Sequence, residues 1–460
     1  MSGTTLPQTV TALDALALGL LDGGARLVTG YPGFHAHDLV DRCGGTFSVN
    51  ERTAYAVAWG AALAGRRAAV AFKNVGLNEA ADPFLNSMYL RTNAGLVVVV
   101  FDDVEVSGSQ IRQDSRHYFD LAPGLWLEPM TAAHAYRCAR AAPRLSEQFN
   151  VPVVLRVTNA LIRSMGTLRR RRRVAPTDRP FVRDPAYAIA HPLNVALQAA
   201  ATASRRQAIT RFVERRFRPE NETCVGPGII QVGATGWSPD EVSRESMCRL
   251  WTIPVPENGL RSWLRLASNV TVREMGMPFV GEKIQAITCR AKMRYRDESA
   301  AANHSANYRV SAEFDALFSV LRSFPHRVVS GDLGSFTMDP SRTIDACLCY
   351  GASVGVAVGC SLARHPGPVF CVTGDSAFLH SGQQAFQEGI HRGARVVVTL
   401  IDNGKAVSTG GQRLPGRIVF PPNCLVREVD HHVASSDTYR TAIEELVAHD
   451  GMTMLHVRVR

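Results

Sequence analysis

Apolar runs of strand length alternate with helix-length segments through the first third of the chain. Runs with strand character lie at residues 26–29, 46–49, 68–72, 96–101 and 151–156, and a helix is expected from Glu51 to about residue 64. Strands that alternate with helices are typical of parallel sheets covered by helices on both faces. We therefore expect a doubly wound sheet in this part of the chain.

The same alternation returns near the C-terminus. Strands are predicted at residues 368–373, 395–400 and 452–458, and helices at 351–363, 381–392 and 437–449, the last with Asp437 as its N-cap. The intervening part is less regular, with strands expected at 228–233 and 270–273. The predicted fold class is α/β, with two doubly wound domains (1–165 and 306–460) flanking a smaller α/β domain within 166–305.

Composition narrows the class of protein. The 460 residues are 46% hydrophobic and 20% charged, which suits a globular chain of two or three domains. No apolar stretch has the length of a membrane span, and the first residues lack the basic region of a secretory signal. The ten cysteines form no Cys-x-x-Cys pair, which favours reduced thiols in a cytoplasmic protein.

Half of the net charge of +10 comes from one run of arginines at residues 169–173. This run follows an apparent domain end and has no interleaved aromatic residues, as a solvated linker would. We therefore expect neither nucleic acid nor a membrane as a partner.

Polar residues follow two of the predicted C-terminal strands. Asp375 lies in Gly374-Asp375-Ser376, and Asn403 lies twenty-eight positions later in Asp402-Asn403-Gly404. The carboxyl ends of parallel strands are where open α/β sheets bind ligands, and oxygen ligands of this kind suit Mg²⁺. An ordinary strand-to-helix turn would also accommodate a Gly-Asp pair.

This spacing resembles the thiamine diphosphate (ThDP) signature, in which Gly-Asp-Gly precedes an asparagine by a similar distance. Serine replaces the third-position glycine here. ThDP chemistry also needs a carboxylic acid that protonates the aminopyrimidine ring, and such an acid requires an apolar pocket that favours its neutral form. Glu51, which follows a predicted strand, suits this role, although acidic residues are also common in the first turn of any helix.

Taken together, several segments resemble the α subunit of indolepyruvate ferredoxin oxidoreductase and its ThDP-dependent relatives. The similarity runs through residues 28–33, 48–51, 73–78, 80–83, 113–118, 345–353, 374–376 and 402–410, with a fainter match at 272–279. Several matches in one order are more specific than any single motif.

The resemblance implies roles for individual residues. Glu51 would activate the pyrimidine of a cofactor held by a neighbouring subunit, so that a homodimer would form its active sites between subunits. Asp375 and Asn403 would hold Mg²⁺ together with the carbonyl of Lys405. The implied cofactor contacts are Gly374, Ser376 and Ala377 at the diphosphate, Tyr350 and Gly351 beneath the bent cofactor, and Gly30, Tyr31 and Pro32 in the first domain.

Two departures from the family change the expected reaction. The printed sequence ends before the family's ferredoxin-like domain, so we expect no oxidation to a thioester. The loop after Gly33 reads Phe34-His35-Ala36-His37, and Asn74 stands where a histidine is expected. We therefore predict a 2-oxo acid decarboxylase or carboligase that forms an acyloin, with indole-3-pyruvate and pyruvate as substrates. His380 and His35 are the expected proton carriers.

Two alternatives remain open. The chain could be the ThDP-bearing subunit of a split 2-oxo acid oxidoreductase that works with a separate partner protein. It could also be a non-catalytic assembly subunit, although the joint presence of Glu51, Asp375 and Asn403 argues against a purely structural role.

Overall fold

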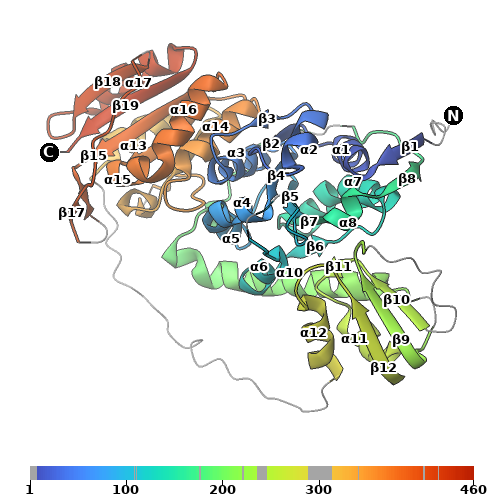
Figure 1. Cartoon of the computed structure of the whole chain (residues 1–460). Coiled ribbons are helices and arrows are strands. Elements are labelled where there is room, and N and C mark those ends of the chain that lie inside the picture. Colours follow the sequence, from blue (N-terminus) through green and yellow to red (C-terminus); the bar gives the residue numbers. More distant parts are fainter. Residues whose placement is uncertain are drawn as a thin grey trace.

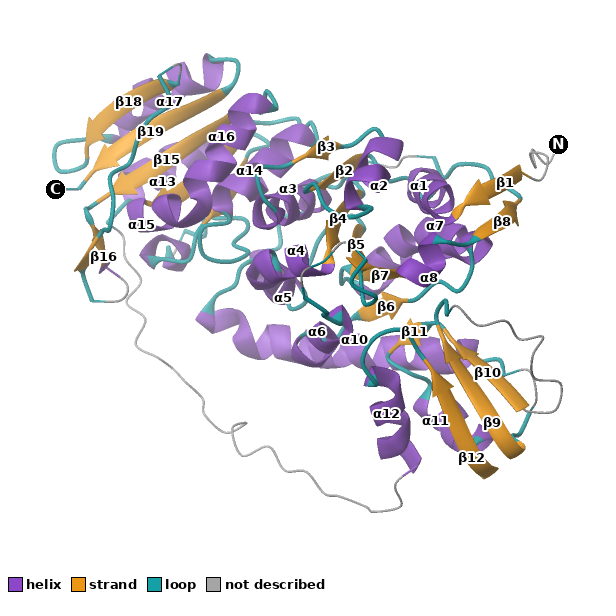
Figure 2. Cartoon of the chain, viewed as in Figure 1, coloured by secondary structure: helices purple, strands orange, loops and turns teal. Residues whose placement is uncertain are grey.

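The computed structural model describes residues 8–107, 109, 111–175, 178–219, 222–235, 246–288, 313–339, 341–407, 410–422 and 424–459. Figure 1 shows an N-terminal α/β unit, a small unit beside it and a C-terminal α/β unit. Figure 2 shows that helices cover the sheets of the two larger units. The predicted boundary between residues 305 and 306 lies outside the described residues.

The N-terminal unit is built on a seven-stranded sheet in the order β11-β6-β7-β5-β4-β2-β3. Its strands are β2 (Leu27–Gly30), β3 (Thr46–Phe47), β4 (Ala68–Lys73), β5 (Leu96–Asp102), β6 (Leu125–Leu127), β7 (Val153–Thr158) and β11 (Thr252–Ile253). All neighbouring pairs are parallel except β11 with β6. Every residue of β5 is buried, as expected for a parallel sheet covered on both faces.

Helices and short elements complete this unit. They are α1 (Ala12–Asp22), α2 (Ala36–Arg42), α3 (Glu51–Leu63), α4 (Asn74–Glu79), α5 (Ala81–Ser87), α6 (Tyr118–Leu121), α7 (Ala132–Phe149) and α8 (Asn159–Ile162), with the antiparallel pair β1 (Gln8–Thr11) and β8 (Met165–Leu168). The expected strands and the helix that begins at Glu51 are therefore present, and β6 is an additional strand.

The small unit has a three-stranded parallel sheet in the order β10-β9-β12. Its elements are α9 (Pro185–Ala188), α10 (Val195–Arg216), β9 (Val225–Val232), β10 (Ser246–Leu250), α11 (Glu257–Trp263), β12 (Leu266–Arg273) and α12 (Phe279–Thr288). Strands β9 and β12 contain most of the two segments predicted as strands in this region.

A buried ionic cluster joins the small unit to the N-terminal unit. Arg116 is fully buried and donates to Asp114 at 2.5 Å and to Glu274 at 2.5 Å. Arg156, also buried, donates to Asp102 at 2.5 Å and to Glu128 at 2.7 Å. Both arginines also donate to the carbonyl of Met275, so the chain that follows β12 is fixed against the N-terminal unit.

The C-terminal unit is a five-stranded parallel sheet in the order β13-β14-β15-β19-β18. Its elements are α13 (Asp315–Ser323), β13 (Val328–Gly331), α14 (Ser353–Leu362), β14 (Val369–Gly374), α15 (Asp375–Ala377), a π-helical turn (Phe378–Gly382), α16 (Gln383–His391), β15 (Val396–Asp402), β18 (Leu425–Asp430), α17 (Ser436–Ala448) and β19 (Met452–Arg458). The short strands β16 (Lys405–Ala406) and β17 (Gln412–Arg413) form a separate pair.

The helix predicted at residues 437–449 begins slightly earlier, and the prediction that Asp437 caps it is wrong. Ser435 is the N-cap, because its hydroxyl accepts from the N–H of Thr438 at 3.2 Å. Asp437 lies in the first turn, where a carboxylate is favoured by the helix dipole rather than by a capping bond.

Helices α3 and α14 bring the two large units into backbone contact. A Cβ atom on Gly60 would lie 2.1 Å from the Val356 carbonyl oxygen, and one on Gly359 would lie 2.1 Å from that of Val57. Only glycine permits so close an approach. None of the described helices is long and apolar enough to cross a membrane.

Candidate active site between the two large units

The carboxyl ends of β14 and β15 open into a cavity of about 270 Å³ in the C-terminal unit. Seven residues predicted for the cofactor and the metal line it: Tyr350, Gly374, Asp375, Ser376, Ala377, Asn403 and Lys405. They come together because β14 and β15 are parallel neighbours, so both of their C-terminal ends face the same edge of the sheet.

Asp375 is held rigidly at this edge. Its side chain accepts the N–H of Ser376 at 2.7 Å through one oxygen and those of Asn403 and Gly404, at 3.1 and 2.7 Å, through the other. Gly404 has a φ of +70°, which lets the chain turn back toward the carboxylate. Burial raises the pKa of Asp375, and the neighbouring Asp402 carboxyl adds to the effect.

A cation fits this arrangement. Asp375 is 1% exposed and lies close to a second carboxyl group, so a positive ion would favour its ionised form. The side chain of Asn403 and the backbone of Lys405 offer neutral oxygen ligands in the same cavity, which is the mixture that Mg²⁺ accepts beside phosphate oxygens. Asp375, Asn403 and the Lys405 carbonyl are therefore the residues that would hold Mg²⁺.

The loop before α14 forms another wall. The hydroxyl of Tyr350 donates to Ser376 Oγ at 2.8 Å, so the tyrosine is tied to the segment predicted to meet the diphosphate. Gly351 has a φ of +76° and its carbonyl accepts from Ser381 at 2.9 Å. His380 is exposed and packs edge-on against the Tyr350 ring, with centroids 5.3 Å apart.

Glu51 lies at the first position of α3, where Asn50 caps the helix by accepting from the N–H of Thr53 at 2.7 Å. Burial raises the pKa of the Glu51 carboxyl, and the nearby Glu79 adds to the effect. A Cβ on Gly76 would lie 2.5 Å from Glu51 Oε1, so glycine at this position of α4 leaves the space that the acid occupies. The neutral form of Glu51 is thus favoured by its surroundings.

The start of α3 contacts the C-terminal unit of the same chain. Arg52 donates to the carbonyl of Tyr350 at 2.5 Å. Glu388 of α16 is 2% exposed and accepts from Ser48 Oγ at 2.8 Å and from the N–H of Val49 at 3.1 Å. Glu51 therefore lies in a segment that is bonded on both sides to the unit that contains Asp375.

The remaining predicted residues lie on the N-terminal unit. Gly30 ends β2 close to the segment that leads to Glu51, since its carbonyl accepts from the N–H of Ser48 at 2.8 Å. Tyr31 and Pro32 lie in the loop that follows β2. His35 has a left-handed φ of 59° and pairs with Asp38 at 3.2 Å. Neither His380 nor His35 lines the cavity around Asp375, although His380 contacts Tyr350, which does.

Two residues at the site were not anticipated. Asp332 follows β13, is fully buried, and accepts from Ser353 Oγ at 2.5 Å and from Thr373 Oγ1 at 2.7 Å, which ties the start of α14 to β14. The signal that could have identified it is the one that revealed Asp375, an aspartate directly after an apolar strand. Arg52 is adjacent to Glu51 in sequence, but its bond to Tyr350 depends on the packing of two distant segments.

Comparison with known proteins agrees with this geometry. Residues 332–457 match the family described as thiamine pyrophosphate enzyme, C-terminal TPP binding domain. Indolepyruvate oxidoreductase subunit IorA of Methanothermobacter thermautotrophicus is 27% identical over an alignment that covers 88% of this chain and 76% of the relative. Phosphonopyruvate decarboxylase of Streptomyces hygroscopicus is 38% identical over 109 residues, or 22% of this chain and 27% of that protein.

Solved structures support the fold. Benzoylformate decarboxylase from Polynucleobacter necessarius superposes with a TM-score of 0.53 over 98% of both chains, at 14% identity. The predicted α/β fold with ThDP-type domains is confirmed. Residues 332–457 are a ThDP-binding domain, and the chain as a whole is related to ThDP-dependent enzymes and resembles the α subunit of indolepyruvate oxidoreductase.

Proposed function

We propose that this chain is a Mg²⁺- and ThDP-dependent enzyme that decarboxylates a 2-oxo acid and joins the acyl unit to a second carbonyl compound, giving an acyloin. The observation that carries the proposal is the cavity that Asp375, Asn403 and Tyr350 line together. The carbonyl of Tyr350 accepts a hydrogen bond from Arg52, which follows Glu51 in the sequence. This arrangement supports the proposal, because one chain would then supply both the anchor for a metal diphosphate and a carboxyl group with a raised pKa.

The proposed reaction needs no external oxidant. The bond between the carboxylate carbon and the carbonyl carbon of the donor breaks, and CO₂ leaves. The electron pair left on the carbonyl carbon forms a new bond to the carbonyl carbon of the acceptor, whose oxygen takes up a proton. Bound ThDP would supply the electron sink for that pair.

The protein's part is to bind, orient and move protons. Asp375, Asn403 and the Lys405 carbonyl would hold Mg²⁺. The backbone N–H groups of Gly374, Ser376 and Ala377 would lie close to the diphosphate. Glu51 would hold a proton against the pyrimidine ring nitrogen, which its raised pKa favours.

Two histidines are proposed as proton carriers. His380 is the stronger candidate, because it packs against Tyr350, which lines the cavity, and its Nδ1 lies 3.0 Å from Ser381 Oγ. His35 lies in the loop that follows Gly30, and its Nδ1 is 3.2 Å from the Asp38 carboxylate.

The substrate class rests on the relatives. Their names include indolepyruvate oxidoreductase, phosphonopyruvate decarboxylase and benzoylformate decarboxylase, and all three names refer to 2-oxo acids. The alignment that covers most of the chain is with the first of these, so we propose indole-3-pyruvate as the donor and pyruvate as the second partner.

The position of Glu51 bears on how the site is completed. That a neighbouring subunit of a homodimer supplies this acid stays a prediction from the resemblance. The bonds from Ser48, Val49 and Arg52 to the C-terminal unit instead favour a site in which Glu51 serves the cofactor of its own chain. Mixing two inactive variants, described in the Discussion, separates the two arrangements.

A second candidate is the ThDP-bearing subunit of a split oxidoreductase, which is favoured by the name of the relative aligned over 88% of the chain. Oxidation would need an electron acceptor, and none of the described cysteines lines the cavity around Asp375. The acceptor would then belong to a partner protein. A non-catalytic assembly subunit is disfavoured, because such a role does not require Glu51, Asp375 and Asn403 together.

Product analysis by mass spectrometry tests the proposal. The purified chain would be incubated with ThDP, Mg²⁺, indole-3-pyruvate and pyruvate, without ferredoxin or coenzyme A, and Glu51→Gln would serve as the control. An acyloin mass together with CO₂, absent in the control, is the expected result. CO₂ with only an aldehyde would restrict the activity to decarboxylation. Bound ThDP without turnover would contradict the proposal and favour the split oxidoreductase.

A further inference from the structure

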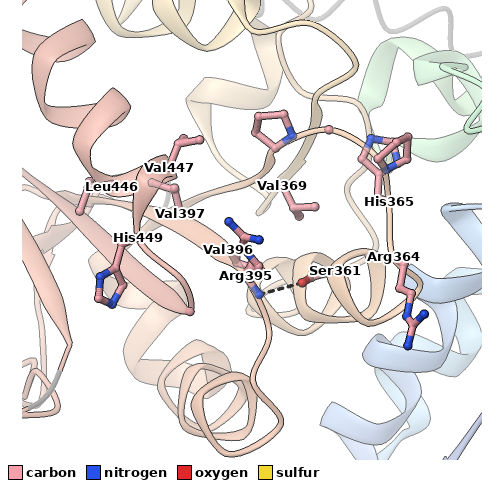
Figure 3. A pocket seen from close by; sticks show the side chains of 14 residues that line it. Ser361, Arg364, His365, Val369, Arg395, Val396, Val397, Leu446, Val447 and His449 are labelled. Carbon is pink, nitrogen blue, oxygen red and sulfur yellow. Dashed lines mark hydrogen bonds between the residues drawn. The ribbon is translucent and has the colours of Figure 1, made fainter.

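A second cavity, of about 430 Å³, lies in the C-terminal unit at the opposite ends of β14 and β15 (Figure 3). Arg364, His365 and Pro366 line this cavity and also line a neighbouring one of about 250 Å³. Five arginines border the combined hollow, which we call the basic groove: Arg66, Arg179, Arg327, Arg364 and Arg395. Asp178 is the only acidic residue among the described residues that line it.

Buried carboxylates hold two of these arginines in place. Glu147, 6% exposed, accepts from Arg67 at 2.7 Å and from Arg179 at 2.8 Å. Asp345, 1% exposed, pairs with Arg183 at 2.5 Å and with Arg327 at 3.0 Å. Each carboxylate thus faces two guanidinium groups, so that one positive charge at each position is not neutralised.

The other arginines differ in their pairing. Arg66 pairs with Asp178 at 3.4 Å and Arg395 with Asp450 at 3.2 Å, and both acids are more than half exposed. Arg364 makes no ion pair within the described part of the chain and is exposed at the mouth that the two cavities share. These pairs leave three positive charges around the groove.

Helix ends reduce this charge without cancelling it. Helices α3 and α14 end at the smaller cavity, where Ala64 and Ala363 line it, and α17 (Ser436–Ala448) ends at the larger one, where Val447 and His449 line it. Each of the three C-termini carries about half a negative charge. A positive balance of about 1.5 charges remains, which is close to the charge of about −1.5 to −2 on a phosphate monoester. The larger cavity also has apolar walls, including Val369 and Leu446, and its volume is in the range of small-ligand sites (Figure 3).

We propose that the basic groove binds a phosphate-bearing small molecule of the size of a nucleotide. The phosphate would be held by Arg364 together with Arg395, and the apolar walls would accept the remainder of the ligand. This site is separate from the cavity around Asp375, and it spans the boundary between the two large units.

Two helices connect the basic groove to the proposed active site. Helix α3 begins at Glu51 and ends at the groove, and α14 begins beside Tyr350 and also ends there. Thirteen residues of helix span about 20 Å, so a ligand that bridges the two C-termini would stabilise the contact between the two units that contribute Glu51 and Asp375 to the proposed active site.

Calorimetric titration with ADP tests the proposal. The titration is done in EDTA without ThDP, so that no metal is available at Asp375. Arg364→Asn removes the charge and suits the left-handed φ of 58° at this position, whereas Arg395→Gln removes the second charge. Arg261→Gln, an exposed arginine of α11, is the matched control. Adenosine and inorganic phosphate are titrated alongside ADP.

The expected result is saturable binding of ADP that weakens about tenfold or more in Arg364→Asn and in Arg395→Gln and is unchanged in Arg261→Gln. Binding that survives both groove substitutions but is lost in Asp375→Ala would place ADP in the cofactor cavity and overturn the proposal. Equal binding of adenosine, or no binding of either phosphate compound, would also overturn it. Circular dichroism of each variant confirms that it is folded.

Discussion

Replacing Gly60 by alanine tests the contact between α3 and α14. The added Cβ would lie 2.1 Å from the Val356 carbonyl oxygen, whereas carbon and oxygen atoms of this kind approach to about 3.3 Å. The helices would have to separate by about 1.2 Å, because a backbone carbonyl cannot rotate away as a side chain can. Such overpacking costs about 1–3 kcal/mol, and the better helix propensity of alanine offsets about 1 kcal/mol.

We therefore expect Gly60→Ala to lower the free energy of unfolding by up to about 2 kcal/mol, measured by urea denaturation. Activity should fall more than stability does. Glu51 and Tyr350 lie at the start of the two helices, and a displacement of about 1 Å at a reacting centre can reduce turnover about a hundredfold. Turnover and ThDP affinity would be measured on the same preparations.

The control is Gly416→Ala, because a Cβ at that position meets no atom within 4 Å. It should leave both the urea midpoint and turnover unchanged. If Gly60→Ala matched the wild type in both measurements, the inferred backbone contact would be wrong, and α3 and α14 would lie further apart in solution.

Three further substitutions probe the site and its support. Because the folded-state pKa of Glu51 is raised, the stability that it contributes is lost as the pH rises above 4.5 through the raised value. Glu51→Gln should therefore gain stability relative to the wild type over that range, and a pH-independent difference in urea denaturation would contradict this. Mixing Glu51→Gln with Asp375→Ala chains should restore no turnover if each chain completes its own site, whereas recovery would show that the acid comes from a neighbouring subunit. Arg116→Met should destabilise the chain by about 3–5 kcal/mol, since it removes the arginine that pairs with Glu274 and leaves Asp114 only its 3.5 Å ion pair with Arg156; a loss below 1 kcal/mol by denaturation would refute this.

Local patterns were enough to predict much of the fold and to place Asp375 and Asn403 together at one edge of the sheet. Asp375 and Asn403 could be recognised because each follows a continuous apolar run, and the position of such residues relative to the sheet is determined by strand direction alone. The closing strand at 452–458 was predicted with its observed bounds for the same reason.

Features that depend on distant packing could not be predicted in this way. The bond from Arg52 to Tyr350 joins segments almost 300 positions apart, and neither residue has a local signal for it. Strand β6 has only three residues, too few to show periodicity. The cap at Ser435 was missed because Asp437 is an equally good capping residue by type, and only the backbone geometry distinguishes the two.

The glycine contact between α3 and α14 also limits how this protein can be recombined. With Gly60 and Gly359 placed against opposing carbonyl groups, the two helices fit each other at the level of the main chain and not through side chains that could repack. A chimera that takes its N-terminal unit from one homologue and its C-terminal unit from another would keep this fit only if both small residues were inherited together. Residues 51–63 and 353–362 should therefore be taken from the same homologue in any chimera, although almost 300 residues separate them in the chain.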